Sequence, residues 1–172
     1  AKGYEEYATA TGTATVTVDP KAVTVSITPN GGTYGSVTAA AAVLSGVVDG
    51  ETVPVTLTYT GTANDGTAYA GTTPPTKAGT YTITATTTNP NYTLDPKTTT
   101  ADFTIAKRPA TVTPDNKSKV YEEKDPKLTY KVSGVLDGET LEGITLARVK
   151  DENAGKYAIT ATADASANPN YD

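Results

Sequence analysis

The 172-residue chain contains no histidine, cysteine, methionine, tryptophan or glutamine. Without histidine or cysteine, it cannot form a Ser-His-Asp triad or a cysteine nucleophile, and it lacks the usual ligands of zinc, copper and haem. The absence of cysteine also excludes disulfides, so stability must come from burial and strand pairing. These absences exclude most classes of enzyme, and we expect a protein without catalytic activity and without a cofactor.

Basic residues and long apolar runs are also scarce. The chain has 14 basic and 19 acidic residues and a formal net charge of -5. Nucleic-acid binding needs a basic face, so this balance argues against such a partner. No stretch approaches the roughly 20 apolar residues of a membrane helix, so no membrane insertion is expected. Without histidine, the net charge should hardly change between about pH 6 and 9.

The residues that are abundant favour strands and turns. There are 36 threonines, 15 glycines, 11 prolines and 11 tyrosines. Apolar residues alternate with threonine and serine along 23–27 and 81–85, as in strands with one buried face. The only candidate helix, Ala39 to Leu44, is flanked by valine and threonine and can equally be a strand. With turn signals between the alternating stretches, the sequence predicts an all-β fold of two Ig-like antiparallel β-sandwich domains in an extended arrangement.

An internal repeat organises the chain, and this is the strongest signal in the sequence. Residues 24–26 with Tyr34 match 111–113 with Tyr121, and residues 45–52 match 133–140. Residues 78–86 match 154–162, and residues 89–92 match 168–171. They predict one domain at 19–106 and a second at 107–172. Matching residues of the two copies are 88 positions apart in the second pair of segments and 76 apart in the third. The first copy therefore carries 88 − 76 = 12 extra residues between these segments. Residues 59–67, within that insertion, read as a hairpin.

The two copies differ at their ends. The alternating segment 98–105 of the first copy has no counterpart before Asp172, so the second copy lacks its closing strand. Residues 1–18 resemble that segment and end in the alternating run 13–18, which indicates the closing strand of a preceding repeat. We expect residues 1–18 to pair along the first domain or, in a crystal, to fill the open edge of another molecule's second domain.

A glycine two residues before a tyrosine marks the start of a late strand in each copy. The blocks are Gly79-Thr80-Tyr81 and Gly155-Lys156-Tyr157. They lie where a tyrosine corner belongs, with the ring in the core and the hydroxyl bonded back to the backbone. We therefore predict a structural role for these residues.

These blocks, together with Tyr34-Gly35 and the two Asn-Pro-Asn-Tyr motifs, resemble the tandem bacterial Ig-like modules known as MBG domains of the Tyr-Gly-x type. Such modules recur in bacterial surface and secreted proteins. The resemblance covers both copies and implies an extracellular location, at the cell wall or secreted, with no catalytic residues. Glu122 stands where the pattern expects glycine after Tyr121, so we expect a different backbone geometry at that turn.

Two groups of side chains are candidate binding residues. Glu122, Glu123 and Asp125 form the densest acidic cluster, and loop carboxylates of this kind can bind calcium, although Lys124 interrupts them. Tyr59 and Tyr69 in the first copy are the best candidates for a ligand surface, because tyrosine presents a rigid amphipathic face. Other tyrosines are interpreted as core (Tyr34, Tyr81, Tyr121, Tyr130, Tyr157) or as structural anchors (Tyr92, Tyr171).

These observations favour a structural stalk or spacer module of a bacterial surface or secreted protein. The linker 106–108 is short and is followed by Pro109, which limits the motion of the two copies relative to each other. We therefore expect each copy to have the neighbouring copy of the same chain as its main partner. Two alternatives stay open. One is an adhesion module that binds host glycan or protein, and the other is an accessory domain of a secreted carbohydrate-active enzyme.

Overall fold

The computed structural model describes residues 12–29 and 31–172, and these residues form strands and no helix. The predicted all-β class is therefore confirmed. The strands are β1 (Lys21–Thr28), β2 (Gly32–Thr33), β3 (Ser36–Val37), β4 (Ala41–Ser45), β5 (Thr56–Ala63), β6 (Ala68–Gly71), β7 (Gly79–Thr86), β8 (Tyr92–Leu94), β9 (Thr100–Ala106), β10 (Thr111–Pro114), β11 (Tyr130–Ser133), β12 (Thr145–Arg148) and β13 (Ile159–Thr162). In this part of the chain, nothing forms a helix long and apolar enough to cross a membrane.

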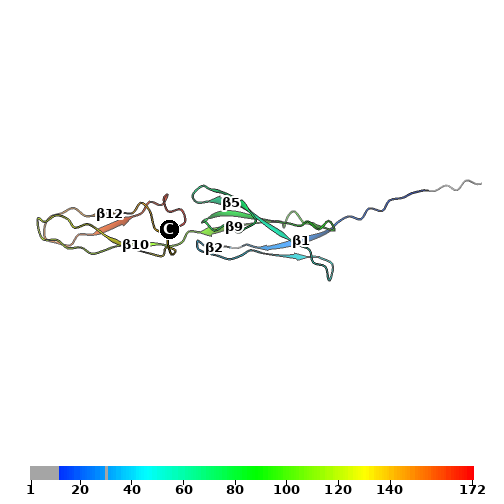
Figure 1. Ribbon diagram of the computed structural model, residues 1–172, viewed down its shortest axis with the longest axis horizontal. Helices are drawn as coiled ribbons and strands as arrows, with labels where there is room; N and C mark the ends of the chain where they lie inside the picture. Colours follow the sequence, from blue (N-terminus) through cyan, green and yellow to red (C-terminus); the bar gives the residue numbers. More distant parts are fainter. Residues whose placement is uncertain (1–11, 30) are drawn as a thin grey trace, which may run out of the picture.

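The molecule is elongated along one axis (Figure 1). Strands β1 to β9 occupy one half, here called the N-terminal part (residues 19–106), and β10 to β13 occupy the other, the C-terminal part (107–172). Residues 12–18 leave the N-terminal part beyond β1, at the end of the molecule that lies away from the C-terminal part.

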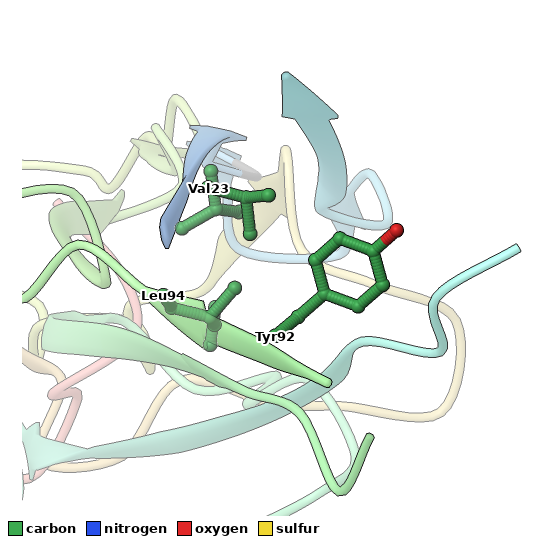
Figure 2. Close-up of a cluster of buried hydrophobic side chains, with 5 residues drawn as sticks. Val23, Tyr92 and Leu94 are labelled. Atoms are coloured by element: carbon green, nitrogen blue, oxygen red, sulfur yellow. The ribbon is translucent and has the colours of Figure 1, made fainter. Parts of the chain in front are cut away.

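The N-terminal part consists of two sheets that pack on each other. One has the strand order β4-β1-β8 and the other β3-β2-β9-β7-β5-β6. Val23 on β1 packs with Tyr92 and Leu94 of β8 in a buried cluster that also contains Ala85 of β7 (Figure 2). Ile27 contacts both this cluster and a second one around Ile83, so a single core joins the two sheets.

Two strand pairs in these sheets are parallel. Lys21 of β1 pairs with Tyr92 of β8, and Gly32 of β2 pairs with Ile105 of β9. The prediction of purely antiparallel sheets is wrong for these pairs. Each joins strands that lie far apart in the sequence, and alternation along one strand carries no information about the direction of a distant neighbour.

The structure decides one alternative that the sequence left open and confirms one local prediction. The ambiguous segment at Ala39 to Leu44 contributes to strand β4, which pairs antiparallel with β1. Strands β5 and β6 form the expected hairpin, whose turn is closed by the Gly66 amide donating to the Ala63 carbonyl at 2.9 Å. The C-terminal part has no counterpart of β6 among its described strands.

The C-terminal part repeats the pairing of β5 with β7 but not that of β7 with β9. Leu146 of β12 lies opposite Ala161 of β13, in the register that places Leu57 opposite Ala85. In the N-terminal part β7 lies between β5 and β9, whereas the described strands pair with β13 on one side only. As a result Ile159 is partly exposed, although its counterpart Ile83 is fully buried.

Residues 12–18, the described residues before β1, have no strand partner in this structure. Residues 12–18 carry no strand assignment, and the side chains of Val16 and Val18 are 89% and 88% exposed. The expected pairing along the N-terminal part is therefore not observed for residues 12–18, and residues 1–11 lie outside the described residues. The alternative, pairing with another molecule, stays a prediction.

The glycines before the two corner tyrosines provide a matched test of packing. A Cβ atom on Gly79 would lie 2.4 Å from the Thr62 carbonyl oxygen and 2.7 Å from the Ala63 Cα. The nearest atom to a Cβ on Gly155 would be the Tyr157 hydroxyl, at 3.2 Å. We expect Gly79→Ala to lower the free energy of unfolding by about 1–3 kcal/mol, because the backbone of β5 must move.

Gly155→Ala serves as the control in the same urea titration. It should change the free energy of unfolding by less than about 0.5 kcal/mol, because a tyrosine side chain can shift more easily than a strand. Equal losses for the two variants would contradict this account of the β5–β7 contact.

Candidate functional site

Both predicted tyrosine corners are present. The Tyr81 hydroxyl donates to the Lys77 carbonyl at 2.9 Å, and the Tyr157 hydroxyl donates to the Asn153 carbonyl at 2.7 Å. The Tyr81 ring is buried, with its centroid 5.5 Å from that of Phe103. The hydroxyl bonds agree with the predicted corners, but the expectation that both rings lie in the core is wrong for Tyr157, which is only half-buried.

A second contact links two motifs that the sequence shows separately. In the N-terminal part, the Tyr92 hydroxyl donates to Oε2 of Glu51 at 2.5 Å and accepts from the Val48 amide at 3.2 Å. The Glu51 amide closes the Asp-Gly turn by donating to the Val48 carbonyl at 3.0 Å. Tyr92, the last residue of the first Asn-Pro-Asn-Tyr motif, is thus hydrogen-bonded to the Asp-Gly-Glu turn.

The C-terminal part contains the same contact. The Tyr171 hydroxyl donates to Oε2 of Glu139 and accepts from the Leu136 amide at 3.1 Å. The Glu139 amide donates to the Leu136 carbonyl at 3.0 Å. The anchor role predicted for Tyr92 and Tyr171 agrees with these bonds.

Glu139 has an additional partner from the other part of the chain. The Tyr34 hydroxyl donates to its Oε1 at 2.6 Å, and the Tyr34 ring meets the Tyr171 ring edge-on, with centroids 5.5 Å apart at 85°. One carboxylate therefore binds a tyrosine from each part of the chain. We call Tyr34, Glu139 and Tyr171 the tyrosine–carboxylate clamp.

The clamp shifts the ionisation of its members in a consistent direction. Hydrogen bonds from Tyr171 and Tyr34 hold the pKa of Glu139 below its ordinary value. The bond to Glu139, together with burial, raises the pKa of Tyr34 to about 12. Ionised Glu139 and protonated Tyr34 are therefore the forms that the geometry stabilises.

Backbone contacts fix the linker beside the clamp. The Arg108 amide donates to the Asn170 carbonyl at 2.8 Å, and Arg108 forms a parallel bridge with Tyr171. Across the joint, the Ala78 amide donates to Oδ1 of Asn170 at 3.0 Å, and Nδ2 of Asn64 donates to the Pro169 carbonyl at 3.3 Å. Several independent hydrogen bonds thus hold the two parts together.

The residue after each of the equivalent tyrosines, Tyr34 and Tyr121, has a left-handed backbone. Gly35 has φ of 80°, and a Cβ atom there would lie 2.7 Å from Cδ2 of Leu136 across the joint. Glu122 has φ of 64°, so the different geometry expected from its replacement of glycine is not found. The turn keeps its conformation, and Glu122 bears the steric strain that a side chain has in this region.

The acidic cluster is not arranged as a metal site. Asp125 pairs with Lys119 at 3.1 Å and with Arg148 at 2.8 Å, and Oε2 of Glu123 accepts from the Val120 amide at 3.3 Å. Within 12–29 and 31–172, no three acidic, histidine or cysteine side chains gather where they could hold a metal ion. The structure therefore does not bring Glu122, Glu123 and Asp125 together as calcium ligands.

A four-membered ring of charges that the sequence analysis missed lies in the same region. Besides binding Asp125, Lys119 and Arg148 both bind Glu152, at 2.5 and 2.8 Å. These residues line an open groove of about 590 Å³ that also exposes Tyr157 and Ile159. No sequence signal could reveal this ring, because its members come from three separate segments.

The two tyrosines expected at a ligand surface have partners within the protein. Tyr59 is buried and meets Phe103 edge-on, so the prediction that it faces a ligand is wrong: alternation along β5 turns it inward. Tyr69 is half-buried, and its hydroxyl donates to the Thr73 carbonyl at 2.6 Å. Conversely, Tyr121 and Tyr130, expected in the core, are 61% and 42% exposed.

A comparison with protein families assigns part of the chain. Residues 110–172 match the family model of the MBG domain (YGX type). The match covers the C-terminal part, and the resemblance of the N-terminal part to the same domain stays a prediction. No curated protein and no solved structure matches the chain.

The clamp predicts a measurable loss when its bridging hydroxyl is removed. Tyr34→Phe should lower the free energy of unfolding by about 1 kcal/mol, because one hydrogen bond to a carboxylate is lost while the ring stays in place. Tyr130→Phe is the control, because Tyr130 is exposed and lies away from the joint. Urea unfolding compares the variants, and an effect of equal size in both would contradict the role of the clamp.

The pKa shifts predict the pH range over which the clamp is closed. Glu139 has a depressed pKa, so its contribution is complete above the ordinary glutamate pKa and is lost as the pH falls through the depressed value. Tyr34 has a raised pKa, so its contribution is complete below the ordinary tyrosine pKa of 10.0 and is lost as the pH rises through about 12. The stability difference between wild type and Tyr34→Phe should therefore be constant at neutral pH and shrink at both extremes. A constant difference up to the highest pH would contradict this assignment.

Proposed function

We propose that the chain is a non-catalytic spacer, in which two Ig-like modules are held end to end as part of a bacterial surface or secreted protein. The observation that carries the proposal is the tyrosine–carboxylate clamp across a linker that is itself hydrogen-bonded on both sides. A spacer must keep its ends apart, and a joint with several directional contacts limits bending more than a free linker does.

The rest of the molecule supports the same role. The match of residues 110–172 to the MBG domain agrees with a module that recurs in surface and secreted proteins. The absence of histidine and cysteine keeps charge and covalent state constant outside the cell. The long axis of the molecule in Figure 1 is the direction along which such a module would separate its neighbours.

The proposal predicts a single, narrow distribution of the distance between the two parts. Because the chain contains no cysteine, spin labels can be placed at Val43→Cys and Val149→Cys alone, two positions whose side chains are 66% and 56% exposed. Electron-spin distance measurements, in excess unlabelled chain, should give one narrow peak. Tyr34→Phe and Glu139→Gln should each broaden it, because the joint loses a directional contact.

Tyr130→Phe in the labelled chain is the matched control and should leave the peak unchanged. A broad distribution in the unmodified chain, or a scattering profile that fits a compact globule, would refute the spacer. Retention of a narrow peak in both clamp variants would show that the clamp does not provide the rigidity.

A further inference from the structure

The end of the N-terminal part that faces away from the C-terminal part, where the loop after β4 lies (Figure 1), repeats contacts of the joint. We call it the outer end. The Lys21 amide donates there to the Asn91 carbonyl at 2.8 Å. At the joint, the Arg108 amide donates to the Asn170 carbonyl, also at 2.8 Å. Lys21 and Arg108 each pair in parallel with the tyrosine that follows the asparagine.

The groups of the C-terminal part that receive the N-terminal part have counterparts at the outer end. The receiving groups are the Glu139 carboxylate, the Tyr171 ring, the side-chain oxygen of Asn170, the Pro169 carbonyl and the Leu136 side chain. The internal repeat places five residues in the same positions, namely Glu51, Tyr92, Asn91, Pro90 and, in place of leucine, Val48. All five lie within residues 48–92, inside the N-terminal part.

The counterparts have the same local arrangement but are more exposed. Tyr92 bonds to the Glu51 carboxylate and to the Val48 amide, which is the contact that Tyr171 makes with Glu139 and Leu136. The joint partly covers four receiving residues, whereas their counterparts at the outer end are exposed: Val48, Glu51, Pro90 and Asn91.

One oxygen of Glu51 is available for a further partner. Among the residues that the structure describes, only Tyr92 donates to the Glu51 carboxylate, and it uses Oε2. The other oxygen, Oε1, corresponds to the one that Tyr34 binds on Glu139. An ionised carboxylate can accept several hydrogen bonds, so the bond to Tyr92 leaves this position able to accept a second one.

We propose that the outer end is a receptor for the tyrosine–glycine turn of a further module of the same type, which docks there as Tyr34 and Gly35 dock on the C-terminal part. The tyrosine hydroxyl donates to Oε1 of Glu51, and its ring meets Tyr92 edge-on. The N-terminal part then presents a turn at one end and accepts one at the other, as stacked repeats do. This inference rests on the proposed spacer function, to which it adds the partner of the outer end.

The combination of groups selects such a module over a simple ligand. A cation could pair with Glu51, but Asn91 and Pro90 add two oxygen acceptors, and Tyr92 and Val48 add apolar surface. A matching partner must therefore supply an aromatic hydroxyl together with N–H donors at fixed places around it. The N-terminal part supplies this set at the joint through the Tyr34 hydroxyl, the Ala78 amide and Nδ2 of Asn64.

The single change of residue type at the outer end does not obstruct the turn. At the joint, a Cβ atom on Gly35 would lie 2.7 Å from Cδ2 of Leu136, so that contact is already close. Val48 has one carbon fewer than leucine and is 46% exposed. A tyrosine–glycine turn therefore has at least as much room at the outer end as at the joint.

The full chain extended by its own N-terminal part tests the inference. Residues 1–107, the leading N-terminal part, are followed directly by residues 21–172, which begin with the inner N-terminal part, so Lys21 takes the place of Arg108 in the new linker. Spin labels at Val43→Cys in both N-terminal parts, in excess unlabelled chain, report the distance across the new joint. One narrow peak is expected, because Tyr34 of the leading part meets Glu51 of the inner part.

The same substitutions can be placed at the new joint or away from it. Tyr34→Phe in the leading part and Glu51→Gln in the inner part should each abolish the narrow peak. Phenylalanine donates no hydrogen bond, and glutamine has one oxygen for two tyrosine hydroxyls. The matched controls are Tyr34→Phe in the inner part and Glu51→Gln in the leading part, which lie away from the new joint and should leave the peak unchanged.

A second pair of labels separates this inference from the spacer proposal. Labels at Val43 of the inner part and at Val149 report the original joint, and a narrow peak there shows that the extended chain is folded. A broad distribution at the new joint beside a narrow one at the original joint would overturn the inference and leave the spacer standing. Equal effects of a substitution in the two N-terminal parts would also overturn it. Broad distributions at both joints would refute the spacer and the inference together.

Discussion

The N-terminal part depends on the pairing of one strand, β9, with its neighbours. Phe103 and Ile105 of this strand fill the core beneath Tyr81, while its backbone bonds to β7 on one side and β2 on the other. The C-terminal part has the same β5–β7 type of pair in β12 and β13, but without a third strand Tyr157 stays half-exposed. The alternate side chains of β9 that face inward, Phe103 and Ile105, thus contribute to the buried cluster that contains Tyr81 and Ile83.

Strand β9 also sets the relation between the two parts, because it continues within a few residues into the hydrogen-bonded linker. The joint beyond it combines hydrogen bonds with the edge-on contact of the Tyr34 and Tyr171 rings. A carboxylate can accept several hydrogen bonds at once, so Glu139 can hold its own turn through Tyr171 and the other part through Tyr34. Glu51 forms the first of these bonds only, which shows that the same local motif can serve within a domain and between domains.

Short-range patterns predicted the local structure well. The hydroxyl bonds of the tyrosine corners and the β5–β6 hairpin each depend on a few neighbouring residues, whose spacing is visible in the sequence, whereas the sequence left Ala39 to Leu44 open between helix and strand. The errors concern burial and distant partners. Tyr59 reads as an exposed hairpin residue, yet it is buried against Phe103 of β9, a strand separated from β5 by β7 in the same sheet. The parallel pairs of β1 and β2 depend on strands more than sixty residues away, and no local rule encodes their direction.

By itself the sequence determined what chemistry is excluded, that the fold is built of strands, and that two related stretches follow one another. These conclusions depend on residue types and on spacing along the chain. Only the tertiary structure decided that the Asp-Gly-Glu turns and the Asn-Pro-Asn-Tyr motifs are halves of one contact, and that Tyr34 reaches Glu139 from the other part. The physical reason is that hydrogen bonds act over about 3 Å in space, whereas Tyr34 and Glu139 are separated by 105 positions in the sequence, a distance that only the folded backbone can close.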